Sequence, residues 1–147
     1  MTPATPAPGI CSYLFAYGTL MSAAGGKMGR AQRQRLGREG SLVAPVATIA
    51  GRLHDLGDYP GLVESNTPGD VVRGEVWHLS SPDPTWLWLD AYEGIVPGNH
   101  SHNEYERLER PVMLTDGTSL SAWVYLYRRP VDPQTFIPGG NWLESLA

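Results

Sequence analysis

Two long β-rich segments that each contain a glycine most constrain the fold of this 147-residue chain. The segment 45–56 reads PVATIAGRLHDL around Gly51, and the segment 71–79 reads VVRGEVWHL around Gly74. β-branched and aromatic residues favour strands, and a glycine inside a strand marks a bulge or a bend. Two interrupted strands therefore predict a sheet that curves, or that closes into a small barrel.

Other segments with the same composition predict further strands: 12–17, 110–115 and 119–127. The first of them, SYLFAY, is short and apolar and stops at Gly18. The other two flank Asp116 and Gly117, and an Asp-Gly pair between β-rich segments is typical of a hairpin. The Tyr-Pro-Gly sequence at 59–61 predicts a turn.

Two segments predict helices. Residues 27–40 contain five basic side chains among apolar ones and end in glycines, which favours a helix with a basic face. That face is either a solvated surface that balances an acidic protein or a means of attracting an anionic substrate. Residues 80–94, SSPDPTWLWLDAYEG, offer Ser81 or Asp83 as a cap, prolines for the first turn and Gly94 for the left-handed position that ends a helix.

The composition excludes several classes of protein. A formal charge of −4 and a pI near 5.5 argue against nucleic acid as a partner, because the phosphate backbone favours a basic surface. No apolar run approaches the roughly 20 residues of a membrane-spanning helix, and the N-terminus lacks the features of a secretion signal. Cys11, the single cysteine, cannot form an internal disulfide, which fits a reducing compartment. We therefore expect a cytoplasmic protein with no membrane or nucleic-acid partner.

Glu93 is the first candidate for chemistry. Together with Trp86, Leu89 and Asp90 it recurs at spacings of three and four, which places it in the last helical turn, on or beside the apolar face. The helix C-terminus carries partial negative charge, and burial against Tyr92 and the tryptophans adds desolvation. Both effects raise the pKa of a carboxyl group toward the value that suits a general base. The spacing alone also allows a glutamate that reaches into solvent.

The second candidate is the sequence Tyr17-Gly18-Thr19-Leu20, where the first strand ends. Its glycine lets a ligand approach the backbone closely, and consecutive free N–H groups form a small pocket for a carboxylate or a developing oxyanion. A plain turn from strand to loop is the alternative.

Other residues of the sequence suggest alternative sites. His100, His102 and Glu104 lie close together in sequence and could supply three metal ligands, although this polar, turn-rich segment favours a loop that is solvated or covers a substrate. Glu75 could be a second acid in the cavity, but we expect it to face solvent or to pair with an arginine. No serine-hydrolase turn and no glycine-rich phosphate loop is present in the sequence.

Taken in order, the motifs resemble the gamma-glutamylcyclotransferase family. The motif YGTL near the N-terminus and the motif DxYEG at 90–94 carry the resemblance. Between and after them come GDYPGLV at 57–63, GEVW at 74–77, YER at 105–107, WVY at 123–125 and GGNW at 139–142, which is similar to the family's closing Gly-x-Trp. The similarity covers residues 14–142 in the family's order.

This resemblance implies an α+β fold: a small curved or closed mixed β-sheet, barrel-like, with a few flanking helices. The segment 1–11, rich in proline, alanine and threonine, is predicted from its composition to be flexible, and the length of the chain predicts one domain, at 12–147. The site residues that the resemblance implies are Glu93 as the catalytic acid and base and, for substrate binding, Tyr17, Gly18, Thr19, Leu20, Tyr105 and Tyr125.

The implied reaction is an attack by the α-amine of a γ-glutamyl amide on its own γ-carbonyl, which releases 5-oxoproline and a free amine. Because the nucleophile belongs to the substrate, the reaction needs no metal and no cofactor, only a folded substrate and one base. A small γ-glutamyl compound is then the partner. The alternative is a non-catalytic module that senses or carries a carboxylated metabolite. The individual substrate and the oligomeric state stay open.

Overall fold

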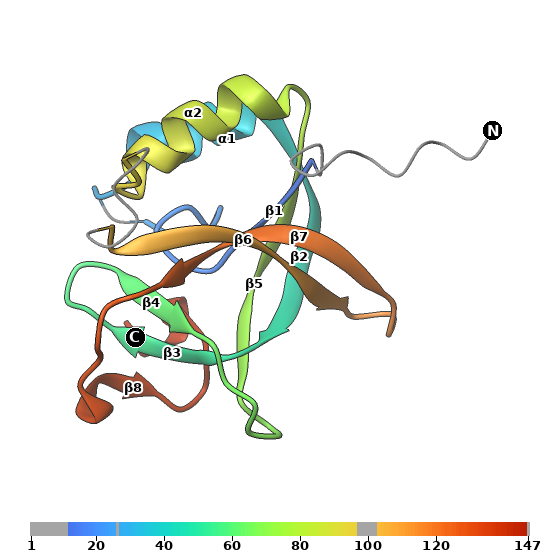
Figure 1. The fold of residues 1–147 in the computed structure, drawn as a ribbon. Helices are drawn as coiled ribbons and strands as arrows, with labels where there is room; N and C mark the ends of the chain where they lie inside the picture. Colours follow the sequence, from blue (N-terminus) through green and yellow to red (C-terminus); the bar gives the residue numbers. More distant parts are fainter. Residues whose placement is uncertain (1–11, 26, 97–102, 147) are drawn as a thin grey trace.

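The computed structural model describes residues 12–25, 27–96 and 103–146 (Figure 1). Along the chain the described elements are β1 (Tyr13–Ala16), α1 (Arg30–Glu39), β2 (Gly40–Ala50), β3 (Arg52–Asp55), β4 (Pro60–Val63), β5 (Val71–Leu79), α2 (Pro82–Tyr92), β6 (Tyr105–Leu114), β7 (Ser119–Tyr127), the 3-10 turn η1 (Pro133–Thr135), β8 (Phe136–Ile137) and α3 (Trp142–Ser145). The expected flexible segment 1–11 lies outside the described residues, and the division into that segment and one domain stays a prediction.

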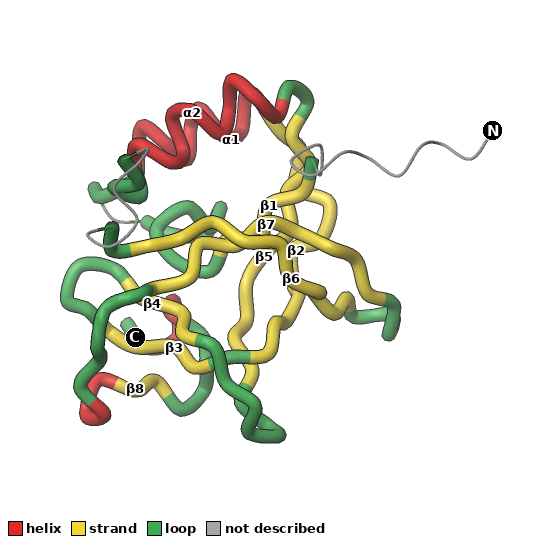
Figure 2. The backbone as a smooth tube through the Cα atoms, in the orientation of Figure 1, coloured by secondary structure: helices red, strands yellow, loops and turns green. Residues whose placement is uncertain are grey.

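Within the described chain, five strands close into a barrel, and Figure 2 shows them wrapping around a common core. Their order is β1-β5-β2-β6-β7, and β7 pairs back with β1 where Leu14 faces Trp123. That last pairing is parallel, whereas the other four pairings of the ring are antiparallel. The structure thus confirms the α+β class and the closed mixed sheet expected from the sequence.

Three more strands of the described chain extend the sheet beyond β7. β4 runs parallel to β7, β3 pairs with β4, and β8 pairs with β3, so that they form a second layer beside the barrel (Figure 1). The turn predicted at 59–61 is wrong, because Pro60 and Gly61 belong to β4. The turn lies just before them and is closed by the N–H of Leu56, which donates to the carbonyl of Tyr59 at 3.0 Å. Proline is tolerated at Pro60 because this is the first residue of the strand.

Gly51 and Gly74, on which the barrel prediction rests, have different roles in the structure. At Gly51 the backbone has a φ of 156°, and the β-rich segment breaks there into β2 and β3. At Gly74 the expected interruption is wrong, since β5 continues through it. A side chain at Gly74 would collide with the carbonyl oxygen of Ala16. The missing side chain therefore lets β1 end close to β5, at the point where the YGTL loop begins.

The two longer helices lie side by side over one end of the barrel (Figure 1). α1 begins and ends inside the predicted range 27–40, and its Arg35 pairs with Glu39 at 2.7 Å and lies 4.8 Å from the ring centre of Trp88 on α2. α2 starts at Pro82 and is followed by Gly94 in the left-handed conformation, with a φ of 75°, as the sequence predicts. The end of α2 is thereby brought over the mouth of the barrel.

Apolar side chains from every strand of the barrel fill the core. The fully buried ones include Leu14, Phe15, Val72, Val76, Val112, Val124 and Leu126. No helix in the described part of the chain is long and apolar enough to cross a membrane.

Candidate active site

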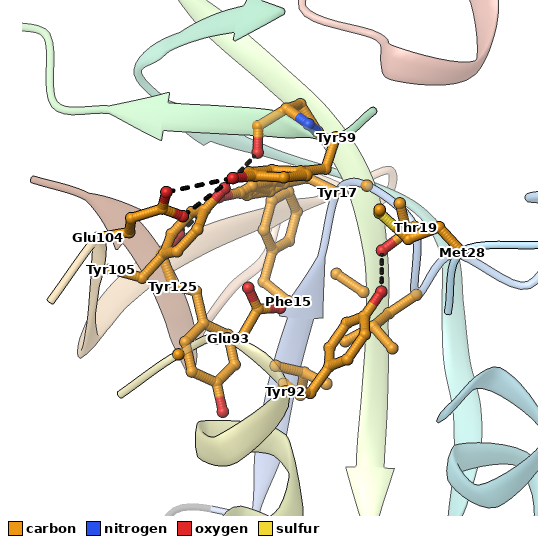
Figure 3. A pocket seen from close by; sticks show the side chains of 16 residues that line it. Phe15, Tyr17, Thr19, Met28, Tyr59, Tyr92, Glu93, Glu104, Tyr105 and Tyr125 are labelled. Atoms are coloured by element: carbon orange, nitrogen blue, oxygen red, sulfur yellow. Dashed lines mark hydrogen bonds between the residues drawn. The ribbon is translucent and has the colours of Figure 1, made fainter. Parts of the chain in front are cut away.

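A cavity of about 240 Å³ opens between the end of α2, the loop after β1 and the barrel wall (Figure 3). Its lining residues come from β1 and the loop after it, from the segment just before α1, from the β3–β4 hairpin, from the end of α2, from the start of β6 and the residue before it, and from β7. They are Leu14, Phe15, Ala16, Tyr17, Gly18, Thr19, Leu20, Met28, Tyr59, Pro60, Tyr92, Glu93, Gly94, Glu104, Tyr105 and Tyr125. Pockets for drug-sized ligands span about 300–1,000 Å³, so this cavity suits a ligand of amino-acid size.

Glu93 occupies the C-terminal cap of α2. Its N–H still donates to the carbonyl of Leu89 at 3.0 Å, and Gly94 then turns the chain away. Figure 3 shows the carboxylate inside the cavity, between the rings of Phe15, Tyr105 and Tyr125. Among the described residues no hydrogen-bond donor reaches this carboxylate. The sequence left open a glutamate that points into solvent, whereas the structure places it facing the cavity.

The environment of Glu93 favours its protonated form. Burial raises the pKa of the carboxyl group from 4.5 to about 8, and the negative charges of Asp90 and Glu104 act in the same direction. The direction agrees with the sequence prediction, and Tyr92, one of the residues expected to bury the group, lines the cavity. The tryptophans of α2 do not line it, so the other rings that surround the group are those of Phe15 and the tyrosines. A carboxyl group with a pKa near 8 both accepts and returns a proton near neutral pH.

The three tyrosines named from the sequence all line the cavity, but their hydroxyl groups donate hydrogen bonds to other groups of the protein. Tyr17 donates to the carbonyl of Tyr125 at 2.6 Å, and Tyr105 donates to the carbonyl of Pro60 at 2.7 Å. Tyr125 donates to the carboxylate of Asp90 at 2.7 Å. Burial is also the first cause that raises the pKa of each of these tyrosines. They therefore form a neutral, fixed wall of rings.

The YGTL loop, whose first residue is Tyr17, forms a further part of the cavity wall. It begins with a tight turn in which the N–H of Met21 donates to the carbonyl of Gly18 at 3.0 Å. The N–H groups of Gly18, Thr19 and Leu20 have no hydrogen-bond partner within the described chain. A Cβ atom on Gly18 would lie 2.8 Å from Cγ of Pro60, so the loop packs closely against β4. Such a loop offers donors for an anionic group of a ligand.

Several residues of the cavity wall were not assigned to the site from the sequence, among them Tyr59, Tyr92 and Glu104. Tyr92 and Thr19 share a hydrogen bond of 2.7 Å between their hydroxyl groups, which joins the end of α2 to the YGTL loop. Tyr59 donates to both carboxylate oxygens of Glu104, at 3.2 and 3.0 Å. Tyr92 belongs to the DxYEG motif, so the signal for it was present. The place of Tyr59 follows only from the β3–β4 hairpin, which the sequence did not predict.

The metal alternative involved Glu104 with His100 and His102, and both histidines lie outside the described residues. Over residues 12–25, 27–96 and 103–146, no group of three or more His, Cys, Asp or Glu side chains could hold a metal ion.

Glu75 is neither solvent-facing nor paired with an arginine, so the expectation for it is wrong. The residue is only 6% exposed and accepts hydrogen bonds from the N–H of Ser22 at 2.8 Å, from Oγ of Ser22 at 2.5 Å and from Nε1 of Trp77 at 3.1 Å. The loop after β1 covers this part of β5, which the spacing of residues along β5 does not show. Glu75 thus anchors the YGTL loop from behind and does not line the cavity.

Fold and site together define a small α+β barrel protein with a proton-binding carboxylate in a cavity sized for an amino-acid-like ligand. The chain belongs to the family described as gamma-glutamyl cyclotransferase, AIG2-like, whose model matches residues 14–144. It is 37% identical over 93 residues to the gamma-glutamylcyclotransferase family protein ytfP of Citrobacter rodentium, and 36% identical over 93 residues to the YtfP protein of Escherichia coli K12. Each match covers 63% of this chain and 68% of the relative.

Solved structures show the same fold. The mouse AIG2-like protein superimposes with a TM-score of 0.62 at 19% identity, covering 84% of this chain and 81% of that one. YkqA from Bacillus subtilis gives a TM-score of 0.64 at 22% identity and covers 90% of this chain. This chain spans only 40% of the length of YkqA.

Proposed function

We propose that the protein catalyses the gamma-glutamylcyclotransferase reaction, in which a γ-glutamyl amide cyclises to 5-oxoproline and releases a free amine. Membership of the family supports the reaction class. The observation that carries the proposal is the carboxylate of Glu93. It faces the cavity with no hydrogen-bond donor from the described residues, and burial raises its pKa to about 8. A structural role gives no reason to keep a desolvated acid without a partner.

The substrate is placed by its charges. Its carboxylate, or the oxyanion that develops at the γ-carbonyl, binds the N–H groups of the YGTL loop, which lack partners in the described chain. Its α-ammonium group then points to Glu93. A free α-ammonium group has a pKa of about 8, close to that of Glu93, so a proton moves between them at little cost in free energy.

The steps balance with a single carboxylate. Glu93 takes a proton from the α-ammonium group, and the freed amine forms a bond to the γ-carbon while the carbonyl electrons move to oxygen. Glu93 gives this proton to the leaving nitrogen, and as the carbonyl re-forms, the bond between the γ-carbon and that nitrogen breaks. Glu93 then takes the second proton from the ring nitrogen, which leaves the neutral lactam, and passes it to the departing amine, which leaves as an ammonium ion. The ring walls of Tyr17, Tyr105 and Tyr125 exclude water and hold the substrate folded, which favours ring closure.

The proposal is tested with Glu93→Gln, which keeps the size of the side chain and removes its basicity. The variant and the wild type are incubated with γ-glutamyl amino acids, γ-glutamylamines and glutathione, and 5-oxoproline and free amine are quantified. We expect turnover to fall by about 10²- to 10⁴-fold. The matched control is Glu144→Gln, which alters an exposed glutamate in α3 and should leave turnover unchanged.

Turnover at the wild-type rate in Glu93→Gln would rule out Glu93 as the base. Binding of these compounds by the wild type without release of any amine would instead support the non-catalytic module. A cytoplasmic location, a small γ-glutamyl partner and the absence of a nucleic-acid partner are part of the same proposal.

A further inference from the structure

Helix α2 is fastened to the β6–β7 hairpin by a set of side chains that we call the Arg107 cluster: Trp86 and Asp90 from α2, Arg107 from β6, and Trp123 and Tyr125 from β7. The guanidinium carbon of Arg107 lies 4.3 Å from the ring centre of Trp86 and 4.6 Å from that of Trp123. The two indole rings meet edge to face, with centres 6.2 Å apart. The cation therefore lies against an aromatic surface contributed by both the helix and the hairpin.

Asp90 is the centre of this cluster. Its Oδ1 accepts hydrogen bonds from Nε of Arg107 at 2.8 Å and from the hydroxyl of Tyr125 at 2.7 Å, and its Oδ2 accepts one from Nη2 of Arg107 at 3.3 Å. The side chains of Arg107 and Asp90 are only 20% and 26% exposed. A two-pronged arginine–carboxylate pair of this kind is more rigid and less screened than an exposed ion pair. One helix residue is thus held by both strands of the hairpin.

The same contacts determine the surroundings of Glu93. Asp90 precedes Glu93 by three residues, so the two carboxylates lie on neighbouring turns of one helix face. The ring of Tyr125 forms part of the cavity wall, but Figure 3 shows its hydroxyl directed away from Glu93. Asp90 holds that hydroxyl, so it is not available as a donor to Glu93.

We infer that Asp90 is a positioning residue of the proposed active site: with Arg107 it locks the end of α2 so that Glu93 faces the cavity, and its charge acts on Glu93 from one helical turn away. The inference rests on the proposed function of Glu93. The other titratable groups that face Glu93 from the surrounding elements are Tyr17 directly after β1, Tyr92 on α2, Glu104 before β6, Tyr105 on β6 and Tyr125 on β7. Of the two carboxylates that act on Glu93, Asp90 has the larger effect.

Two variants should shift the pKa of Glu93 in opposite directions. Asp90→Asn keeps a hydrogen-bond acceptor for Arg107 and Tyr125 but removes the negative charge. The acidic limb of the kcat/KM profile should therefore move to lower pH, by about 0.5–1 pH unit. Arg107→Met keeps the charge of Asp90 but removes the cation that offsets it, so the same limb should move to higher pH.

The matched control is Asp83→Asn, which removes one negative charge from the first turn of the same helix. Asp83 is seven residues from Asp90, about 10 Å along the helix axis, and it does not line the cavity. This variant should leave the profile in place. A purely structural role of Asp90 would lower activity in Asp90→Asn without moving the limb, and that result would overturn the inference.

A second readout does not depend on turnover. The carboxyl carbon of Glu93 is titrated by 13C NMR in the wild type, Asp90→Asn and Arg107→Met, and its resonance is identified by its loss in Glu93→Gln. Opposite shifts of the midpoint in the two variants support the inference even when no γ-glutamyl amide is cleaved, in which case only the proposed function fails. If Glu93 titrates at the same midpoint in Arg107→Met, Asp90→Asn and the wild type, the inference is wrong whatever the activity.

Discussion

Glu93 should make the folded protein less stable as the pH rises, and Glu93→Gln should remove this effect. Burial raises the pKa of the carboxyl group from 4.5 to about 8 in the folded protein, whereas the unfolded chain retains the ordinary value. Between these two pKa values the folded state keeps a proton that the unfolded state has lost. Because the folded state binds more protons, the free energy of unfolding falls with rising pH, by about 1.4 kcal/mol per pH unit.

The size of the effect follows from that interval. If the full interval between 4.5 and about 8 were expressed, the loss of stability at pH 9 would be roughly 5 kcal/mol. Glu93 is half-buried and its carboxylate faces an open cavity, so water and nearby dipoles relax around the charge. We therefore expect about 2–3 kcal/mol. At pH 5 the contribution is still small, about 0.8 kcal/mol, because the folded protein holds the proton while the unfolded chain, with a pKa of 4.5, has already lost most of it.

The assay is urea unfolding of the wild type and Glu93→Gln at each pH from 5 to 9, followed by tryptophan fluorescence. We expect the variant and the wild type to differ by less than about 1 kcal/mol at pH 5, and the variant to be more stable by about 2–3 kcal/mol at pH 9. Glu144→Gln removes an exposed carboxylate and measures how the loss of a charge alone affects the titration. A stability difference between Glu93→Gln and the wild type that is the same at pH 5 and pH 9 would refute the reasoning.

Two further predictions concern the YGTL loop. Gly18→Ala places a Cβ atom 2.8 Å from Cγ of Pro60, so the cavity wall must shift. We expect the free energy of unfolding in urea to fall by about 1–3 kcal/mol and calorimetry to show weaker binding of 5-oxoproline. Unchanged binding would contradict the close packing of the loop. Glu75→Gln puts an amide N–H₂ group against the hydrogen-bond donors of Ser22 and Trp77. We expect the free energy of unfolding in the same assay to fall by about 1–3 kcal/mol. A variant as stable as the wild type would contradict the anchoring role of Glu75.

Local signals were enough for part of the fold. The Asp116-Gly117 pair predicted the hairpin that joins β6 to β7, and Gly51 predicted a break in the sheet. The sequence placed the start of the first hairpin strand at residue 110, whereas β6 begins at Tyr105. The added residues include Glu106 and Arg107, which are poor strand formers by composition. In the structure Glu106 pairs with Arg128 on the next segment at 2.8 Å, so tertiary contacts outweigh the local propensity.

The candidate site could be predicted only where its determinants are close in sequence. The prolines before α2 and Gly94 after it were sufficient to place Glu93 at a helix end. The groups that bury it come from β1, β6 and β7, far along the chain in both directions, and helix spacing carries no information about them. Sequence reasoning therefore obtained the direction of the pKa shift and the contribution of Tyr92, but it assigned the rest of the burial to the tryptophans of α2.

Glu75 and Glu93 show why burial alone does not identify a functional acid. Each stands next to a glycine in a short motif, so the sequence does not separate them. Glu75 is 6% exposed and accepts three hydrogen bonds, so its charge is compensated and its removal leaves donors unpaired. Glu93 receives no hydrogen bond from the described residues, so its negative charge is uncompensated. Removal of that charge should therefore stabilise the folded protein at high pH. The two glutamine substitutions should therefore change stability at pH 9 in opposite directions, which would separate an acid that stabilises the fold from one that does not.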